Sequence, residues 1–126
     1  MNNMKNFFVI FLMFTISSVY ANPGKDIFDK YCTVCHSPSM APMFNSPAAH
    51  DLNAWNERKN DAFNRAVEEN TLLKNLTGDE KEKQAIKSLV SSAIAGTDKG
   101  MPPMGTCADC SEEDLKAAIE FMSSAD

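Results

Sequence analysis

Apolar residues recur at helical spacing in four stretches of the chain, separated by stretches rich in proline, glycine and polar residues. Positions three and four apart share one face of an α-helix, so this pattern predicts helices over about 23–31, 55–75 and 78–95 and after Ser111. The apolar faces comprise Ile27, Phe28 and Tyr31; Phe63, Ala66, Val67 and Leu72 or Leu73; Ala85, Ile86, Leu89, Val90, Ala93 and Ile94; and Leu115, Ala118, Ile119 and Met122. No stretch alternates as a strand does, so the sequence predicts an all-α domain.

Capping residues mark where two of these helices begin and where one ends. Thr77–Glu80 has the spacing of a capping box, and Gly96 follows the third apolar face, where glycine commonly ends a helix. Ser111 precedes three acidic residues, which favour the first turn of the last helix. The stretches 37–53 and 96–110, which contain proline and little periodicity, are predicted to be loops.

The first 21 residues have the composition of a signal peptide. Lys5 precedes an apolar run, and small residues follow at Val19 and Ala21. The run is shorter than the roughly 20 residues that a membrane-spanning helix needs, so we expect cleavage after Ala21 and no stable membrane insertion. Residues 22–126 then form one domain, which we expect to be periplasmic.

The net charge restricts the possible partners. The whole chain carries −5, and loss of Lys5 with the signal peptide makes the charge of the remaining domain one unit more negative. An acidic surface argues against nucleic acid and anionic lipid as partners, because both are themselves negative.

The pentapeptide CTVCH, residues 32–36, is the most specific motif in the chain. Cys-x-x-Cys-His is typical of c-type haem attachment: the thiols of Cys32 and Cys35 bind the porphyrin, and His36 can reach the iron. Two other interpretations are weaker. A thioredoxin-like dithiol requires a βαβ context, and a zinc site would need four ligands, which Cys107 and Cys110 could complete by count alone.

A second axial ligand is expected from the loop around Met101-Pro102-Pro103-Met104. Its prolines stiffen the backbone, and a His/Met pair suits electron transfer. The spacing does not choose between Met101 and Met104, and Met40, Met43 and His50 are lesser candidates. Cys107-x-x-Cys110 has no adjacent histidine, so in an exported protein a disulfide is the simplest interpretation and a redox-active dithiol the alternative.

CTVCH together with GMPPMGTCADCSEEDLKAAIEFM, residues 100–122, resembles the class I c-type cytochromes of the cytochrome c5 type. The resemblance implies a small helical domain wrapped around one covalently bound haem c, attached through Cys32 and Cys35. It implies that His36 and Met101 are the iron ligands and that a disulfide joins Cys107 and Cys110. The chain departs from the family at the loop after His36 and at about 60–83, a segment that we interpret as an insert.

The longer loop after His36 leaves two candidates for the carbonyl that accepts a hydrogen bond from this histidine, Pro42 and Pro47. The aromatic residues Phe28, Tyr31 and Trp55 are predicted to line the haem pocket.

The resemblance implies a periplasmic electron carrier that is not an enzyme. Its expected partners are redox proteins: membrane respiratory complexes, oxidases or reductases. The alternative hypothesis is a haem-based ligand-binding or sensor protein with a displaceable sixth ligand.

Overall fold

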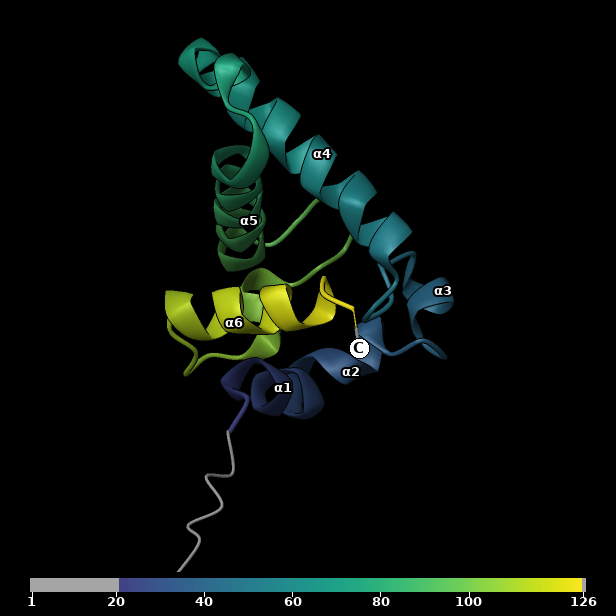
Figure 1. Cartoon of the computed structure of the whole chain (residues 1–126). Helices are drawn as coiled ribbons and strands as arrows, with labels where there is room; N and C mark the ends of the chain where they lie inside the picture. The colour runs from purple at the N-terminus through teal and green to yellow at the C-terminus, as the bar shows by residue number, and fades with distance from the viewer. Residues whose placement is uncertain (1–20, 126) are drawn as a thin grey trace, which may run out of the picture.

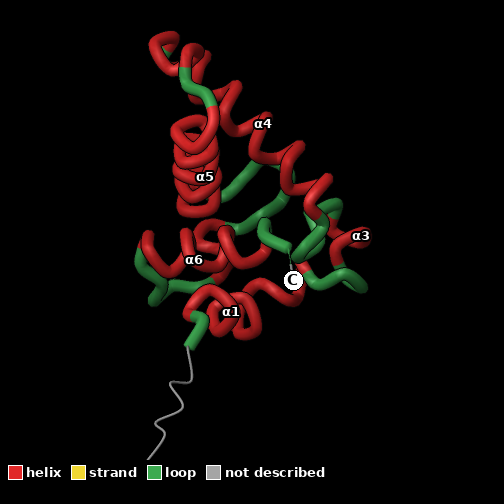
Figure 2. Tube along the Cα trace, viewed as in Figure 1, coloured by secondary structure: helices red, strands yellow, loops and turns green. Residues whose placement is uncertain are grey.

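The computed structural model describes residues 21–125, which are helical and contain no strand (Figure 2). The all-α prediction is therefore confirmed for this part of the chain. The elements are α1 (Pro23–Ile27), η1 (Phe28–Cys32), α2 (Thr33–His36), α3 (Ala41–Phe44), α4 (Leu52–Glu69), η2 (Thr71–Asn75), α5 (Gly78–Ala95), η3 (Pro103–Thr106) and α6 (Glu112–Met122). The predicted signal peptide lies almost wholly outside the described residues. No helix within residues 21–125 is long and apolar enough to cross a membrane.

The first helical segment runs without a break from Pro23 into the CTVCH motif. Asn22 caps it by accepting a hydrogen bond from the backbone N–H of Lys25, and Pro23 occupies the first turn, where a missing N–H costs nothing. The middle of the segment, η1, is one turn of π-helix that ends at Cys32. π-turns inside α-helices are frequently found at functional sites. The CTVCH motif thus begins where the helix changes its pitch.

Helices α1 and α6 cross at close range and form the base of the domain (Figure 1). A Cβ placed on Gly24 would lie 2.2 Å from the carbonyl oxygen of Ala117, so only glycine fits this crossing. Four residues further along this helical segment, the ring of Phe28 packs on that of Phe121, with the ring centroids 5.4 Å apart. The two ends of the described chain are therefore packed against each other.

Helices α4 and α5 form a hairpin that projects from this base. Figure 1 shows them meeting near η2 and separating toward α6. Lys59 pairs with Glu82 across the hairpin at 2.5 Å, and the ammonium group of Lys81 lies 5.0 Å from the centroid of the Phe63 ring. The segment 60–83 that we interpret as an insert lies within this hairpin.

The apolar faces of the hairpin largely match the periodicity. The buried residues are Trp55, Ala62, Phe63 and Ala66 on α4 and Ala85, Ile86, Val90 and Ala93 on α5. Leu73 is half-buried, whereas Leu72 is 81% exposed, because the tighter turn of η2 takes it out of the α-helical period. The prediction for Ile94, which is 37% exposed in the last turn of α5, is wrong.

The two stretches predicted to be loops, 37–53 and 96–110, both contain helical residues. A single helical turn, α3, forms at Ala41–Phe44 with Pro42 in its first turn, and α4 already begins at Leu52. The loop 96–110 contains the short 3-10 turn η3. Such one-turn helices are too short to produce an apolar period.

Two helix starts that look alike in sequence differ in structure. Ser111 accepts from the backbone N–H of Asp114, whose carboxylate accepts from the N–H of Ser111, so α6 begins with a complete capping box. The capping box predicted at Thr77–Glu80 does not form. The side chain of Thr77 makes no capping hydrogen bond, and the carboxylate of Glu80 instead forms an ion pair with Lys83 at 3.0 Å. Gly96 ends α5 with φ = 78°, as predicted.

Replacing Ser111 by alanine should therefore lower the free energy of unfolding by about 1 kcal/mol, because the backbone N–H of Asp114 loses its acceptor. Urea titration followed by circular dichroism measures this change. Thr77→Ala is the matched control, and we expect it to cost only a few tenths of a kcal/mol. Equal losses for the two variants would contradict the difference between the caps.

Candidate cofactor site

A cavity of about 550 Å³ lies between the base and the hairpin. This volume is in the range of roughly 300–1,000 Å³ typical of sites for small molecules and cofactors. Its walls come from α2, the loop after α3, α4, α5, the loop 96–102 and α6. The residues that line it include Cys35, His36, Pro47, Trp55, Leu89, Ala93, Met101, Ile119 and Met122. Residues far apart in sequence thus face one mostly apolar space.

His36 is the buried polar group of this cavity. Its Nδ1–H donates to the carbonyl oxygen of Pro47 at 2.8 Å, so Pro47, and not Pro42, is the acceptor. A carbonyl can only accept, so Nδ1 carries the proton and Nε2 of the neutral ring has a free lone pair. Burial lowers the pKa of His36, and the hydrogen bond to Pro47 opposes this only in part, which keeps the ring neutral. A neutral imidazole with one ring nitrogen held by a carbonyl is the usual form of a histidine metal ligand.

The loop that holds His36 is fixed by backbone hydrogen bonds and by Trp55. The N–H of Ala49 donates to the carbonyl of His36 at 2.7 Å, and the hydroxyl of Ser46 donates to the carbonyl of Cys35. The indole N–H of Trp55 donates to the carbonyl of Ala48 at 2.8 Å, and its ring stacks on His36 with centroids 5.8 Å apart. The histidine is therefore oriented before any ligand binds.

Of the three aromatic residues predicted to line the pocket, only Trp55 does so. Phe28 and Tyr31 pack instead against the core between α1 and α6, because the helical face that carries them is the one covered by α6.

Met101 lines the cavity, whereas Met104 is not among the lining residues. A tight turn sets its position: the N–H of Thr97 donates to the carbonyl of Met101 at 2.9 Å, and the N–H of Met101 donates to the hydroxyl of Thr97 at 3.2 Å. Met104 has φ = 60° and packs against the core cluster. The lesser candidates Met40, Met43 and His50 also do not line this cavity, and the Nδ1–H of His50 donates to the carbonyl oxygen of Ser124.

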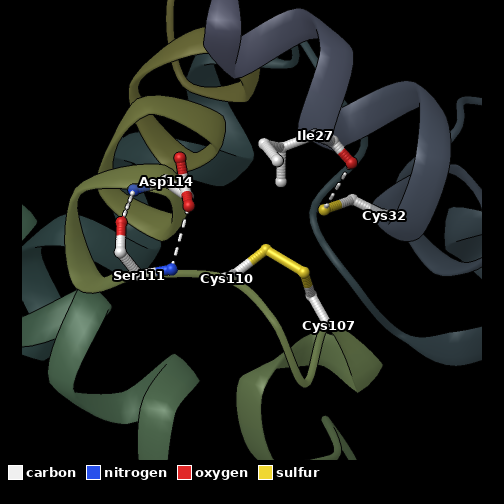
Figure 3. Close-up of a disulfide and its surroundings, with 6 residues drawn as sticks. All are labelled: Ile27, Cys32, Cys107, Cys110, Ser111 and Asp114. Carbon is white, nitrogen blue, oxygen red and sulfur yellow. Dashed lines mark hydrogen bonds between the residues drawn. A yellow bond between two sulfur atoms is a disulfide. The ribbon is translucent and has the colours of Figure 1, made fainter.

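The two cysteines of CTVCH are free thiols in different surroundings. Cys35 lines the cavity, whereas the thiol of Cys32 lies 3.9 Å from the carbonyl oxygen of Ile27 (Figure 3). Burial, with a smaller contribution from Cys35, raises the pKa of Cys32 to about 11. The thiol of Cys32 is thus protonated, and neither Cys32 nor Cys35 is consumed by a disulfide.

Cys107 and Cys110 are joined by a disulfide, as predicted. It connects η3 to the start of α6 and lies opposite Cys32 (Figure 3). This bond removes both thiols from the four-cysteine zinc hypothesis, and no group of three or more potential metal-binding His, Cys, Asp or Glu residues occurs within residues 21–125. The thioredoxin-like hypothesis lacks its βαβ context in the same residues.

The residues around the cavity fit a haem c. They provide a histidine with a free Nε2, a thioether at Met101, a thiol at Cys35 and an apolar lining for a flat porphyrin. The sequence analysis missed the charged residues of the lining, Arg58, Asp61, Arg65, Asp98 and Lys99. A signal existed for three of them, because positions 58, 61 and 65 share one face of a helix that also carries Trp55.

Comparison with known proteins agrees with this chemistry. Residues 20–122 match the family model described as "Cytochrome C oxidase, cbb3-type, subunit III". The chain is 33% identical over 103 residues to a cytochrome c5 of Azotobacter vinelandii, covering 82% of this chain and 94% of that protein. It is 31% identical over 103 residues to a cytochrome c5 of Ectopseudomonas mendocina, covering 82% and 90%. No solved structure matches the chain significantly. The chain therefore belongs to the cytochrome c family, as a cytochrome c5-like electron carrier and not an enzyme.

Proposed function

We propose that this protein is a periplasmic monohaem cytochrome c that carries single electrons between respiratory redox partners. In this proposal Cys32 and Cys35 attach the haem, and His36 and Met101 ligate its iron. The observation that supports it most directly is that Cys35, His36 and Met101, separated by up to 66 positions, line one cavity. The described residues contain no membrane-crossing helix, which fits a carrier that moves between membrane complexes.

The chain prepares this site for electron transfer in three ways. The bond from Nδ1 of His36 to Pro47 directs the free nitrogen into the cavity and makes it a better donor. The turn between Thr97 and Met101 holds the thioether, which favours Fe(II) and raises the reduction potential. Trp55, Leu89 and Ile119 exclude water from the walls. When bound, haem supplies an iron that changes between Fe(II) and Fe(III).

The test is a visible spectrum of the matured protein, oxidised and then reduced, with carbon monoxide added last. We expect the sharp bands of c-type haem, a weak sulfur-to-iron band in the oxidised state and no change with carbon monoxide. Ready binding of carbon monoxide would contradict the carrier and favour the ligand-binding alternative. A spectrum without haem would refute the proposal altogether.

Met101→Ala should open the sixth position, so that the reduced variant binds carbon monoxide nearly stoichiometrically where the wild type does not. The reason is that the substitution removes Met101, the methionine that the loop 96–102 contributes to the cavity lining. Met104→Ala is the matched control, because it removes the same side chain from the same loop. Loss of the sulfur-to-iron band in Met104→Ala but not in Met101→Ala would reverse the ligand assignment.

A further inference from the structure

The chain contains two arginines among its 12 basic residues, and both line the cavity. Arg58 and Arg65 lie seven residues apart on α4, which places them on one face of the helix about 10 Å apart along its axis. Nine of the ten lysines lie within residues 21–125, and of these nine only Lys99 is part of the lining. The planar guanidinium group binds carboxylates through two parallel hydrogen bonds, which an ammonium group cannot do.

The two arginines differ in their hydrogen bonds to the rest of the protein. Arg58 is half-buried and donates to the carbonyl of Asn45 at 3.2 Å, so it closes the loop after α3 against α4. Arg65 is exposed at the cavity and, within residues 21–125, forms neither a hydrogen bond nor an ion pair. It lies in the stretch 60–83 that we interpret as an insert, at a point where α4 continues past the base of the domain.

The charged groups around Arg65 are few. Asp61 lies between the two arginines on α4, and Asp98 and Lys99 come from the loop that carries Met101. From α5 and α6 the cavity receives only uncharged side chains, namely Leu89, Ser92, Ala93, Ile119 and Met122. The three cations and two carboxylates of the lining therefore sum to a charge of +1. All five charged residues come from α4 or from the loop 96–102.

We propose that Arg65 binds a propionate carboxylate of the haem, so that the outer half of α4 takes part in holding the cofactor and in setting its reduction potential. This inference rests on the proposed function, because haem brings the carboxylates. These are the anionic groups of an otherwise apolar ring. Among residues 21–125, Arg65 and Lys99 are the lining cations that form neither a hydrogen bond nor an ion pair, and of the two only Arg65 has the planar guanidinium that binds a carboxylate through two hydrogen bonds. The proximity of the positive charge keeps the carboxylate ionised and offsets its charge at the iron.

Arg65→Gln should lower the reduction potential, because a lost positive charge near the iron favours Fe(III) over Fe(II). It should also move the pH-dependent part of the potential to higher pH, since a carboxylate without its cation gains a proton more easily. Lys87→Gln is the matched control: it removes the same charge from an exposed position on α5 that does not line the cavity. The measurement is a redox titration of the haem-loaded variants from about pH 5 to 9.

The result expected is a larger shift in Arg65→Gln than in Lys87→Gln, with most of the wild-type potential restored in Arg65→Lys. Equal potentials and pH profiles for Arg65→Gln and Lys87→Gln would overturn the inference. So would an Arg65→Lys variant as low as Arg65→Gln, because the charge would then not be the cause. Both results leave a haem-loaded His/Met carrier intact, whereas a wild type without haem refutes the proposed function itself.

Discussion

Replacement of Trp55 by alanine is expected to lower the free energy of unfolding by about 3–5 kcal/mol, the cost of removing a large buried aromatic side chain. Trp55 is 4% exposed and belongs to the core cluster. It also stacks on His36 and holds the carbonyl of Ala48, one residue from the acceptor of the His36 proton. The variant should therefore lose both stability and a fixed orientation of the histidine. Because Trp55 is the only tryptophan, unfolding in urea is followed by circular dichroism.

Trp55→Phe separates packing from hydrogen bonding. The phenyl ring keeps most of the buried aromatic surface but leaves the carbonyl of Ala48 without its donor, which should cost about 1–3 kcal/mol. We expect the free energy of unfolding of Trp55→Phe to lie between that of the wild type and that of Trp55→Ala. A free energy of unfolding for Trp55→Ala within about 1 kcal/mol of the wild type would mean that Trp55 is not a packed member of the core cluster.

Gly24→Ala should destabilise the protein by about 1–3 kcal/mol although alanine is the better helix former. Helix propensity alone would favour alanine by about 1 kcal/mol. The added Cβ would meet the backbone oxygen of Ala117 at 2.2 Å and the Cβ of Phe121 at 3.0 Å. Backbone cannot rotate away as a flexible side chain can, so α1 and α6 must move apart and the packing of Phe28 on Phe121 loosens. The steric effect therefore outweighs the propensity.

Lys25→Ala is the control for this change, because it alters the next residue of α1 but only an exposed ion pair with Asp29. We expect it to cost less than about 0.5 kcal/mol. Urea titration of both variants gives the comparison. A Gly24→Ala protein more stable than the wild type would mean that the two helices do not cross at the distance described.

Local periodicity was enough to predict the long helices and their buried faces. On α6, for example, Leu115, Ala118, Ile119 and Met122 are buried as expected, because a helix needs only one face covered to show its period. The CTVCH motif likewise drew attention to His36, which the structure places, buried, on the cavity wall. Features defined by neighbours in sequence were therefore accessible.

Features that depend on contacts beyond the immediate sequence pattern could not be predicted from the sequence. The choice of Pro47 over Pro42 depends on α3, a single turn with no period of its own, which takes Pro42 into its first turn. The capping box at Thr77 failed because Lys83 competes for Glu80. Arg65 is not among the residues predicted from the sequence, and its place on the cavity wall depends on the angle at which α4 leaves the base. Contacts between separate segments decide the first and the third, whereas the second is decided by a local ion pair between residues three apart on α5.

The crossing of α1 and α6 also orders events during synthesis. About 85 residues separate the two helices, and at about 5–20 residues per second the ribosome needs roughly 4–17 s to make them. Cys32 and Cys35 follow α1 directly, so they too are made several seconds before the helix that packs on their segment. The base of the domain therefore cannot close until the last helix of the chain has been made. Its formation depends on the finished chain and not on a locally folded N-terminal segment.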